Sequence, residues 1–267
     1  MNRVSEVIEG LAKVRAIDLS GQVAIVTGGT RGLGRDIAAG LAGAGCVVVV
    51  CGRNAPVSLP EGVTWQQADI RDPDAARALV DGVVAAHGRL DIVINNAGGS
   101  PAADAVTSSA RFVDAILKLN LVGPLFMAQA AHPHMALAGG GCIINIASVS
   151  GIRPSPGTAI YGAAKAGLLN LTQSLAQEWG HANIRVNAII AGLMVTDNAE
   201  ATYGDASAQA AVGASMPLGR MGAGEDLAGA VLWLCSPLAS WVSGARINVD
   251  GGGERPYFLD LVKGAAA

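Results

Sequence analysis

The sequence predicts an α/β protein of one domain, built on a doubly wound parallel sheet of about seven strands with helices on both faces. Three observations predict this class. Short apolar runs alternate with longer helical patterns along nearly the whole chain. Two of the runs, Val47–Val50 and Ile92–Ile94, are apolar at successive residues, as is typical of strands that are covered on both faces. A glycine-rich turn follows the first run and leads directly into a helical pattern.

The elements are expected in alternating order. The expected strands are 23–27, 47–51, 63–67, 91–95, 141–147, 184–190 and 245–249. The expected helices are 33–44, 73–87, 109–137, 159–179 and 225–235. Asp72-Pro73-Asp74 is a good helix start, because a capping residue is followed by proline in the first turn. Gly88 and Gly180 mark helix exits. Strands that return through helices predict right-handed crossovers and hence parallel pairing.

The ends of the chain are expected to be additions to one central domain, residues 21–251. Residues 1–20 form an N-terminal extension, in which apolar residues at helical spacing predict a short amphipathic helix: Val4, Ile8, Leu11 and Val14. This extension lacks the long apolar core of a signal peptide. Residues 252–267 form a C-terminal tail.

The composition is that of a soluble enzyme. A net charge of −3 provides no electrostatic case for binding nucleic acid or an acidic membrane. Charged residues make up only 15% of the chain and apolar residues 51%, so we expect a partner chain to cover part of the surface. The uncharged segment 37–52 contains four glycines and divides into a helix and a strand, which argues against a membrane span.

The metal-binding residue types show no metal-binding pattern. The four cysteines lack paired spacing, and we expect them to be buried free thiols in a reducing cytoplasm. His132-Pro133-His134 has no third ligand nearby in the sequence, so a solvated or packed helix end is favoured over a zinc site.

The glycine-rich turn is the first candidate binding motif. Gly28, Gly32 and Gly34 would let the backbone approach a pyrophosphate closely, and the N–H groups at the helix start would hold this anion. Their spacing is Gly-x-x-x-Gly-x-Gly, which differs from the common Gly-x-Gly-x-x-Gly fingerprint. The alternative is a turn that merely lets a helix pack close to a strand.

The candidate catalytic motif is Tyr161-Gly-Ala-Ala-Lys165, with Ser148 upstream at the end of an apolar run. Residues four apart share one face of a helix, so the lysine can lie beside the phenol. A free phenol has a pKa near 10, and a neighbouring cation would lower it toward neutral pH. The Ser148 hydroxyl would hydrogen-bond a substrate carbonyl while Tyr161 transfers the proton.

Taken together, these motifs resemble those of the short-chain dehydrogenase/reductase family, over roughly residues 20–251. They fall in the family's order: Thr27–Gly34, Asp69, Asn95–Gly98, Asn120, Ser148 and Tyr161-x-x-x-Lys165. The resemblance implies a Rossmann-like fold and hydride transfer between a nicotinamide dinucleotide and a carbonyl or secondary alcohol. It also implies a catalytic tetrad of Asn120, Ser148, Tyr161 and Lys165.

Within this tetrad the resemblance implies that Tyr161 is the acid/base and that Lys165 lowers its pKa and bonds the nicotinamide ribose. Asn120 would open its helix and hold a proton-relay water. The alternative for Asn120 is a side chain that only hydrogen-bonds its own backbone, since asparagine is not favoured inside helices.

The loop after the second strand favours NADP(H) over NAD(H). Gly52 stands where NAD-type members of the family usually carry aspartate, and Arg53 follows it. Arg31 occupies a second position where NADP-type relatives are basic. Two guanidinium groups can hold the 2′-phosphate by charge-assisted hydrogen bonds. The alternatives are two ordinary surface arginines and an NAD(H)-dependent alcohol dehydrogenase of the same fold.

The resemblance implies a larger set of cofactor contacts. They are Gly28, Thr30, Arg31, Gly32, Leu33, Gly34, Arg53, Asn54, Asp69, Ile70, Asn96, Ala97, Gly98, Tyr161, Lys165, Gly192 and Thr196. Asp69 would contact the adenine amino group, with turn formation as the alternative. Thr196 would bond the nicotinamide carboxamide. The family usually has Pro-Gly after the sixth strand, and Ala191-Gly192 leaves this loop less constrained.

The substrate pocket is expected to be mostly apolar. Its candidate residues are Val149, Ser150, Ile152, Arg153, Leu193, Met194 and Tyr203, and Arg153 would face an anionic group. Residues 194–218 are interpreted either as a mobile lid or as a plain pair of surface helices. Dicarbonyls, 3-oxoacyl thioesters, steroids, sugars and quinones all remain candidate substrates.

The resemblance also implies a homo-oligomer, either a dimer or a tetramer, in the cytoplasm. Two other function classes remain open. One is a dinucleotide-binding protein that has lost its chemistry. The other is a lyase, epimerase or enoyl reductase on the same fold, because a fold does not fix a function.

Overall fold

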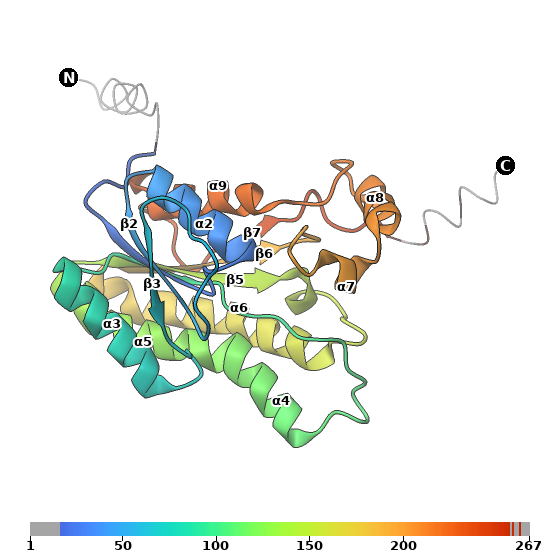
Figure 1. Ribbon diagram of the computed structural model, residues 1–267, viewed down its shortest axis with the longest axis horizontal. Helices are drawn as coiled ribbons and strands as arrows, with labels where there is room; N and C mark the ends of the chain where they lie inside the picture. The colour runs from blue at the N-terminus through green and yellow to red at the C-terminus, as the bar shows by residue number, and fades with distance from the viewer. Residues whose placement is uncertain (1–16, 257, 259–261, 263–267) are drawn as a thin grey trace.

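The predicted α/β architecture is confirmed by the computed structural model, which describes residues 17–256, 258 and 262 (Figure 1). Among these residues seven parallel strands form one sheet in the order β3-β2-β1-β4-β5-β6-β7. The strands are β1 Val23–Thr27, β2 Val47–Gly52, β3 Val63–Gln67, β4 Ile92–Asn95, β5 Gly141–Ser148, β6 Ile184–Ala191 and β7 Arg246–Val249. The predicted N-terminal helix lies outside the described residues.

The helices enclose the sheet from both sides. Their bounds are α2 Gly32–Gly43, α3 Pro73–His87, α4 Ala110–Leu117, α5 Gly123–Leu137, α6 Ala159–Trp179, α7 Ala199–Tyr203, α8 Ala206–Ser215 and α9 Gly224–Cys235. Helices α2 and α9 cover one face, and α3, α5 and α6 cover the other (Figure 1). As predicted, α3 begins at a capped proline: the Asp72 side chain accepts a hydrogen bond from Asp74 N, and Gly88 ends the helix in the left-handed region.

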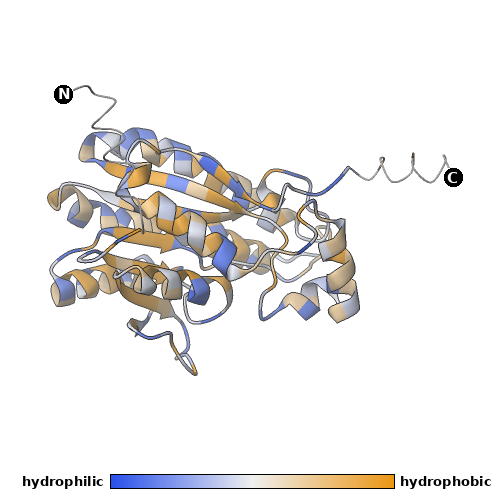
Figure 2. Ribbon diagram, turned by 90° about the horizontal axis from the view of Figure 1, so that it is seen from above, coloured by the Kyte–Doolittle hydropathy of each residue, from blue (hydrophilic) through white to orange (hydrophobic). Residues whose placement is uncertain are grey.

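Each face of the sheet has its own apolar core. On one face Ile37 and Leu41 of α2 meet Leu227 and Val231 of α9 over the strands. On the other face the core includes Leu79, Val83, Met127, Ala131 and Leu175. The inner strands β1, β4 and β5 are therefore buried on both faces, and most of the strand ribbons in Figure 2 are orange. Burial of each large aliphatic side chain stabilises the fold by about 1.5–3 kcal/mol.

The strand order marks the position at which a ligand would bind. Strand β1 pairs with β2 on one side and with β4 on the other, so the chain reverses its direction of winding there. In such sheets ligands bind at the carboxyl ends of the strands next to the reversal. The glycine-rich turn, Asn95–Gly98 and Ser148 all follow carboxyl ends of strands, so the topology gathers them.

A series of buried side-chain hydrogen bonds holds β4 and β5 together near this position. Asn95 Nδ2 donates to Asn145 Oδ1 at 2.8 Å, and Asn145 Nδ2 donates to Thr172 Oγ1 at 2.9 Å. The two asparagines are also register partners in β4 and β5. Because an unpaired buried amide is costly, this series of hydrogen bonds ties β4, β5 and α6 together in one register.

The predicted helix 109–137 is interrupted. Between α4 and α5 residues Lys118–Val122 form a π-helical turn. The run Ala110–Leu137 is long and apolar enough to cross a membrane by length and composition alone, a test that core helices also pass. Met127, Ala131 and Met135 of α5 are fully buried in the protein core, which identifies α5 as a core helix.

Several smaller features of the sequence also have a defined place in the structure. Segment 37–52 divides into α2 and β2 as predicted. The four cysteines are buried free thiols. His132 packs against Trp179, with ring centroids 4.8 Å apart, and His134 Nε2 lies 2.7 Å from Asp81 Oδ1. Within the described part of the chain no three His, Cys, Asp or Glu side chains are grouped as metal ligands would be. Segment 194–218 contains the helix pair α7 and α8.

Candidate active site

The glycine-rich turn brings three segments into close contact. Gly28 and Gly32 have φ values of 65° and 50°, in the left-handed region that favours glycine. A Cβ at Gly28 would lie 2.9 Å from Ala97 Cα. A Cβ at Gly34 would collide with the Asn96 side chain. These glycines are therefore required by the approach of the turn to the segment after β4, in addition to any ligand.

The start of α2 fits a phosphate group. Its N-cap residue, Arg31, has extended backbone, and within the described chain no side chain caps the first turn, which carries no acidic residue. A Cβ at Gly32 would have only Asp197 Oδ2 within 4 Å, at 3.8 Å, so the space beside it is open. Uncapped N–H groups at a helix start attract anions. The turn therefore fits the pyrophosphate of a dinucleotide.

Thr27, the last residue of β1, organises the segment after β4. Its buried hydroxyl accepts hydrogen bonds from the N–H groups of Asn96 and Ala97, both at 3.0 Å, and lies 3.3 Å from Ile94 O. The Asn96 side chain in turn donates to Thr27 O at 2.9 Å. Thr27 thus positions two expected cofactor contacts, a role that sequence reasoning missed.

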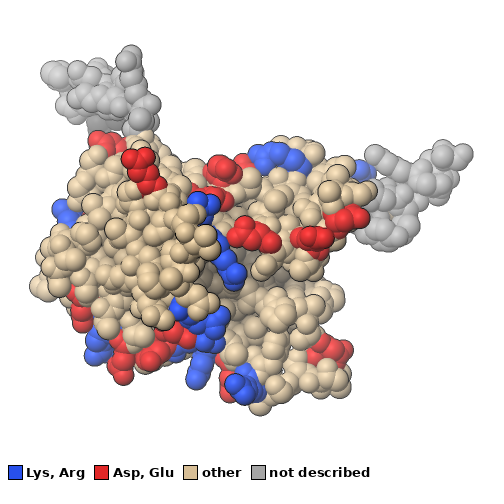
Figure 3. All heavy atoms as spheres, in the orientation of Figure 1, with Lys and Arg blue, Asp and Glu red and all other residues tan. Residues whose placement is uncertain are grey.

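Two basic side chains stand at the end of β2 and the start of α2. Arg31 and Arg53 are exposed, and in the described chain neither forms an ion pair. A Cβ at Gly52 would lie 3.4 Å from Thr30, so the two segments adjoin. Lys and Arg side chains also lie beside a hollow in the face of Figure 3, most of whose surface is uncharged.

Asp69 is already engaged in the structure. Its carboxylate receives a two-point interaction from Arg71, with Nε to Oδ1 at 2.9 Å and Nη2 to Oδ2 at 2.5 Å. Arg71 N also donates to Asp69 Oδ1, which is the turn arrangement that the sequence left as an alternative. The hydrogen bond from Arg71 is the main cause that lowers the pKa of Asp69, and the Arg53 charge adds to it. The neighbouring Ile70 is buried against Gly123.

Asn120 lies in the π-helical turn and is fully buried. Gly123 N donates to Lys118 O, five residues back, so the helix is opened at Asn120 as predicted. The Asn120 side chain donates to Gly99 O and Ile116 O, both at 3.0 Å, and accepts from Gly99 N at 2.8 Å. It therefore bonds its own helix and also the loop after β4.

Gly98 is the point where Asn120 and Lys165 meet. A Cβ there would lie 2.8 Å from Asn120 Oδ1 and 3.1 Å from Lys165 Nζ. Lys165 is only 3% exposed, and its ammonium donates to Ile146 O at 2.7 Å. Burial lowers the pKa of Lys165 to about 8. Any side chain at Gly98 would displace one of these polar groups.

Ser148 and Tyr161 face each other across the end of β5. Ser148 accepts a hydrogen bond from Ser150 N at 3.2 Å and is hydrogen-bonded with the Tyr161 hydroxyl. Lys165 Nζ lies 5.6 Å from the centroid of the Tyr161 ring. Three members of the expected tetrad are thus adjacent, and Asn120 reaches them through Gly98.

The pKa of Tyr161 in this structure does not show the expected lowering. Burial raises the pKa of Tyr161 above its ordinary value, the hydrogen bond from Ser148 opposes this, and the nearby Tyr203 adds to the rise. The physical reason is burial, which removes most of the water that would stabilise the phenolate anion. Desolvation of the phenolate therefore dominates.

The loop after β4 lines one side of the site, which the sequence analysis did not predict. A small hollow beside Tyr161 is lined by Ser100, Ala103, Ala105, Ser108, Phe112, Gly157, Thr158, Ala159 and Ile160. Ala103 N donates to Gly157 O at 2.8 Å, which holds this loop against the start of α6. The available signal was its place at the carboxyl end of β4, where ligands bind in such sheets.

The expected pocket residues divide into two groups. Val149 is buried in a small core with Leu169, and Met194 is buried against Gly222, so these two side chains belong to the core. Ile152 is exposed, and Ser150 accepts a hydrogen bond from Ser155 at 3.1 Å.

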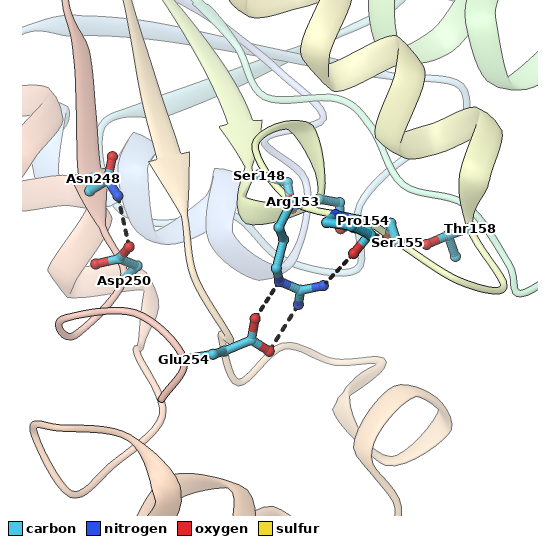
Figure 4. Close-up of polar contacts among 9 residues, drawn as sticks. Ser148, Arg153, Pro154, Ser155, Thr158, Asn248, Asp250 and Glu254 are labelled. Atoms are coloured by element: carbon cyan, nitrogen blue, oxygen red, sulfur yellow. Dashed lines mark hydrogen bonds and ion pairs between the residues drawn. The ribbon is translucent and has the colours of Figure 1, made fainter. Parts of the chain in front are cut away.

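The second group is Leu193, Arg153 and Tyr203. Leu193, which precedes Met194, is half-buried. Arg153 forms an ion pair with Glu254 of the C-terminal segment, a partner that sequence reasoning missed (Figure 4). The Tyr203 hydroxyl is hydrogen-bonded with the Met194 backbone, and burial raises the pKa of Tyr203.

The loop after β6 is fixed mainly by packing. Gly192 N donates to Val249 O at 3.0 Å, and a Cβ at Gly192 would lie 2.6 Å from Asp250 Cα. Thr196 Oγ1 accepts from Asn198 N at 3.3 Å at the start of α7. The glycine is therefore needed for close approach to β7 even without proline before it.

The comparisons with known proteins agree with this architecture. A family model described as enoyl-(acyl carrier protein) reductase matches residues 28–254. The chain is 39% identical over 245 residues to 2-dehydro-3-deoxy-D-gluconate 5-dehydrogenase of Escherichia coli, covering 89% of this chain and 97% of that protein. It is 37% identical over 247 residues to gluconate 5-dehydrogenase of Gluconobacter oxydans, covering 88% and 95%.

A solved structure shares the fold as well. A crystal structure described as that of a short-chain alcohol dehydrogenase from Sinorhizobium meliloti superposes with a TM-score of 0.82, at 36% identity, over 88% of this chain and 97% of that one. Since the family model and these relatives span most of the sequence, this chain belongs to the short-chain dehydrogenase/reductase family of nicotinamide-dependent oxidoreductases.

Proposed function

We propose that residues 21–251 form the NADP(H)-binding and catalytic domain of an oxidoreductase that interconverts a carbonyl and a secondary alcohol. The observation that carries the proposal is the meeting of Ser148, Tyr161 and Lys165 at the carboxyl end of β5, the same end of the sheet at which the uncapped α2 begins. A hydrogen-bonding pair and a buried cation next to a phosphate site suit proton transfer coupled to hydride transfer.

In the proposed mechanism the bound dinucleotide supplies or accepts the hydride. In reduction Ser148 donates a hydrogen bond to the substrate carbonyl oxygen, and Tyr161 transfers its hydroxyl proton to that oxygen as negative charge develops. The raised pKa of Tyr161 keeps this phenol protonated at neutral pH, which suits the role of general acid. Oxidation of an alcohol uses the same groups in reverse.

Lys165 and Asn120 would return the proton to Tyr161. Both side chains border the Cβ position of Gly98, and the π-helical turn brings the Asn120 side chain to the loop after β4. By family resemblance we propose that Asn120 holds a water that connects Lys165 with solvent, and that Lys165 bonds the nicotinamide ribose.

The test of the catalytic role is Tyr161→Phe. We expect kcat for NADPH-dependent carbonyl reduction to fall about 10²–10⁴-fold, because positioned proton transfer contributes that much. NADPH binding, measured by nucleotide fluorescence, and the far-ultraviolet circular dichroism spectrum serve as controls and should be unchanged. Turnover close to that of the parent enzyme would remove Tyr161 from the mechanism and leave a dinucleotide-binding protein as the better proposal.

The proposed preference for NADP(H) rests on Arg31, Arg53 and the missing acid at Gly52. The test is Gly52→Asp, which the structure tolerates because a Cβ at this position would lie 3.4 Å from Thr30. We expect the ratio of kcat/KM for NADPH to that for NADH to fall about 10- to 100-fold, since a carboxylate repels the 2′-phosphate and binds a free 2′-hydroxyl.

The matched control is Gly52→Asn, which has the same size without the charge. It should leave most of the preference intact. A parent enzyme that uses NADH as well as NADPH would overturn the proposed preference, and equal effects of Asp and Asn would show that bulk rather than charge decides.

A further inference from the structure

The ion pair between Arg153 and Glu254 has the geometry of carboxylate recognition. Arg153 Nη2 donates to Glu254 Oε1 at 2.9 Å, and Nε pairs with Oε2, so both carboxylate oxygens are bound by one edge of the guanidinium (Figure 4). Arg153 Nη1 donates to Pro154 O at 3.0 Å, which fixes the plane of the group. A two-point arrangement of this kind selects carboxylates over point charges.

The pair joins the loop after β5 to the segment after β7. Arg153 follows Ser148 by five residues and is held by its N–H to Val149 O at 3.1 Å. Glu254 comes from the segment after β7, more than a hundred residues away in the sequence. The charges of Arg153 and Glu254 both act on the pKa of Tyr203, and Tyr203 in turn acts on the pKa of Tyr161.

Glu254 follows three consecutive glycines. The three residues before it, Gly251 to Gly253, all have positive φ, at 65°, 95° and 79°. The residue before these glycines is anchored, because Asp250 accepts from Asn248 Nδ2 at 2.8 Å and from Gly252 N at 3.2 Å (Figure 4). Backbone rotation at glycines is inexpensive, so the carboxylate can leave while its anchor stays.

The pair is also weak enough to exchange. The Arg153 and Glu254 side chains are 37% and 39% exposed, and ion pairs with this access to water contribute little to stability. An incoming carboxylate that forms the same two hydrogen bonds therefore has little to overcome.

We propose that Arg153 recognises the carboxylate of an acidic substrate, and that Glu254 occupies this position until the substrate displaces it. The substrate class is a hydroxy or oxo acid whose reacting carbon lies some bonds away from its carboxylate. This inference rests on the proposed function, because it places the charged end of the substrate in the same site as the reacting carbonyl.

The experiment compares binding of D-gluconate with that of D-glucitol, which has the same carbon chain and an alcohol in place of the carboxylate. Isothermal titration calorimetry on the full chain saturated with NADPH measures both dissociation constants without turnover, because neither ligand has a ketone or aldehyde that NADPH could reduce. We expect Arg153→Met to weaken gluconate binding about 10- to 100-fold and to leave glucitol binding unchanged. We expect Glu254→Gln to strengthen gluconate binding about two- to fivefold, because the competing charge is removed.

The matched control is Arg89→Met, which breaks an equivalent two-point pair with Asp91 at the opposite edge of the sheet. It should change neither dissociation constant. Equal binding of gluconate and glucitol to the parent enzyme overturns the inference. So does a Glu254→Gln variant that weakens both ligands alike, which would make the pair a structural strap.

The outcome is separable from that of the proposed function. Carbonyl reduction by NADPH without discrimination between acid and alcohol ligands would refute the role of Arg153 and leave the oxidoreductase standing. If Arg153 makes the protein bind gluconate more tightly than glucitol but no carbonyl compound leads to oxidation of NADPH, the role of Arg153 stands and the proposed oxidoreductase is refuted.

Discussion

Lys165 carries its charge in a place with almost no access to water, and this has a thermodynamic cost. Among the described residues its ammonium has one acceptor, Ile146 O, and burial lowers its pKa to about 8 from 10.5. Below about pH 8 the folded protein therefore holds a charge that it would hold more easily when unfolded. A residue placed in this way at the centre of a site is better explained by chemistry than by stability.

The pH dependence of stability should report this cost. Between about pH 8 and pH 10.5 the unfolded Lys165 keeps its proton and the folded one does not, so stability rises with pH in this window. We expect the free energy of unfolding of the parent, relative to Lys165→Met, to increase by about 2 to 3 kcal/mol from pH 7 to pH 10. Urea denaturation of both proteins at the two pH values measures this difference.

The methionine variant is the control for every other titrating group, since both proteins share them. A gap between parent and variant that stays constant from pH 7 to pH 10 would show that the folded lysine keeps an ordinary pKa. The free-energy cost of burying the Lys165 charge would then be offset by interactions other than its hydrogen bond to Ile146 O.

At the scale of elements, the strands are the part of the fold that the sequence predicts best. Consecutive apolar residues such as Val47–Val50 leave few alternatives to a buried strand, and the observed ends of β1 and β3 agree with the predicted ones. Helix 109–137 is predicted as one rod because hydrophobic periodicity carries no signal for a π-helical turn. The local hints are Asn120, a polar residue in an apolar helix, and Gly123-Pro124, a helix-breaking pair directly after the turn.

The candidate site is predicted unevenly for a related reason. Residues within one motif, such as Tyr161 and Lys165, keep the relation that helix spacing imposes. Contacts between distant segments have no corresponding spacing in the sequence. For this reason the sequence does not predict the contact of Glu254 with Arg153 or the hollow that Phe112 lines beside Tyr161. Met194 faces the core because Gly222 leaves room for its side chain, and a glycine 28 residues later gives no indication of that.

On the scale of the whole molecule, the surface is unusually poor in charge. Charged residues are only 15% of the chain, and Figure 3 shows a face that is mostly uncharged. Several large apolar side chains are exposed near the β7 edge of the sheet, among them Leu238 and Trp241, the latter 99% exposed. Strand β7 ends the described sheet, so its outer edge can pair or pack with another chain.

We expect the protein to form a homo-oligomer that buries Trp241. Burial of an indole at an interface removes a large apolar surface from water, and such residues often dominate the affinity. Sedimentation velocity at micromolar concentration should give a dimer or tetramer for the parent, and Trp241→Ser should raise the dissociation constant about tenfold or more. Val57→Ser is the control, because Val57 is equally exposed but lies in the loop between β2 and β3. A monomeric parent would refute the association itself, whereas an oligomer insensitive to Trp241→Ser would place the interface on another face of the molecule.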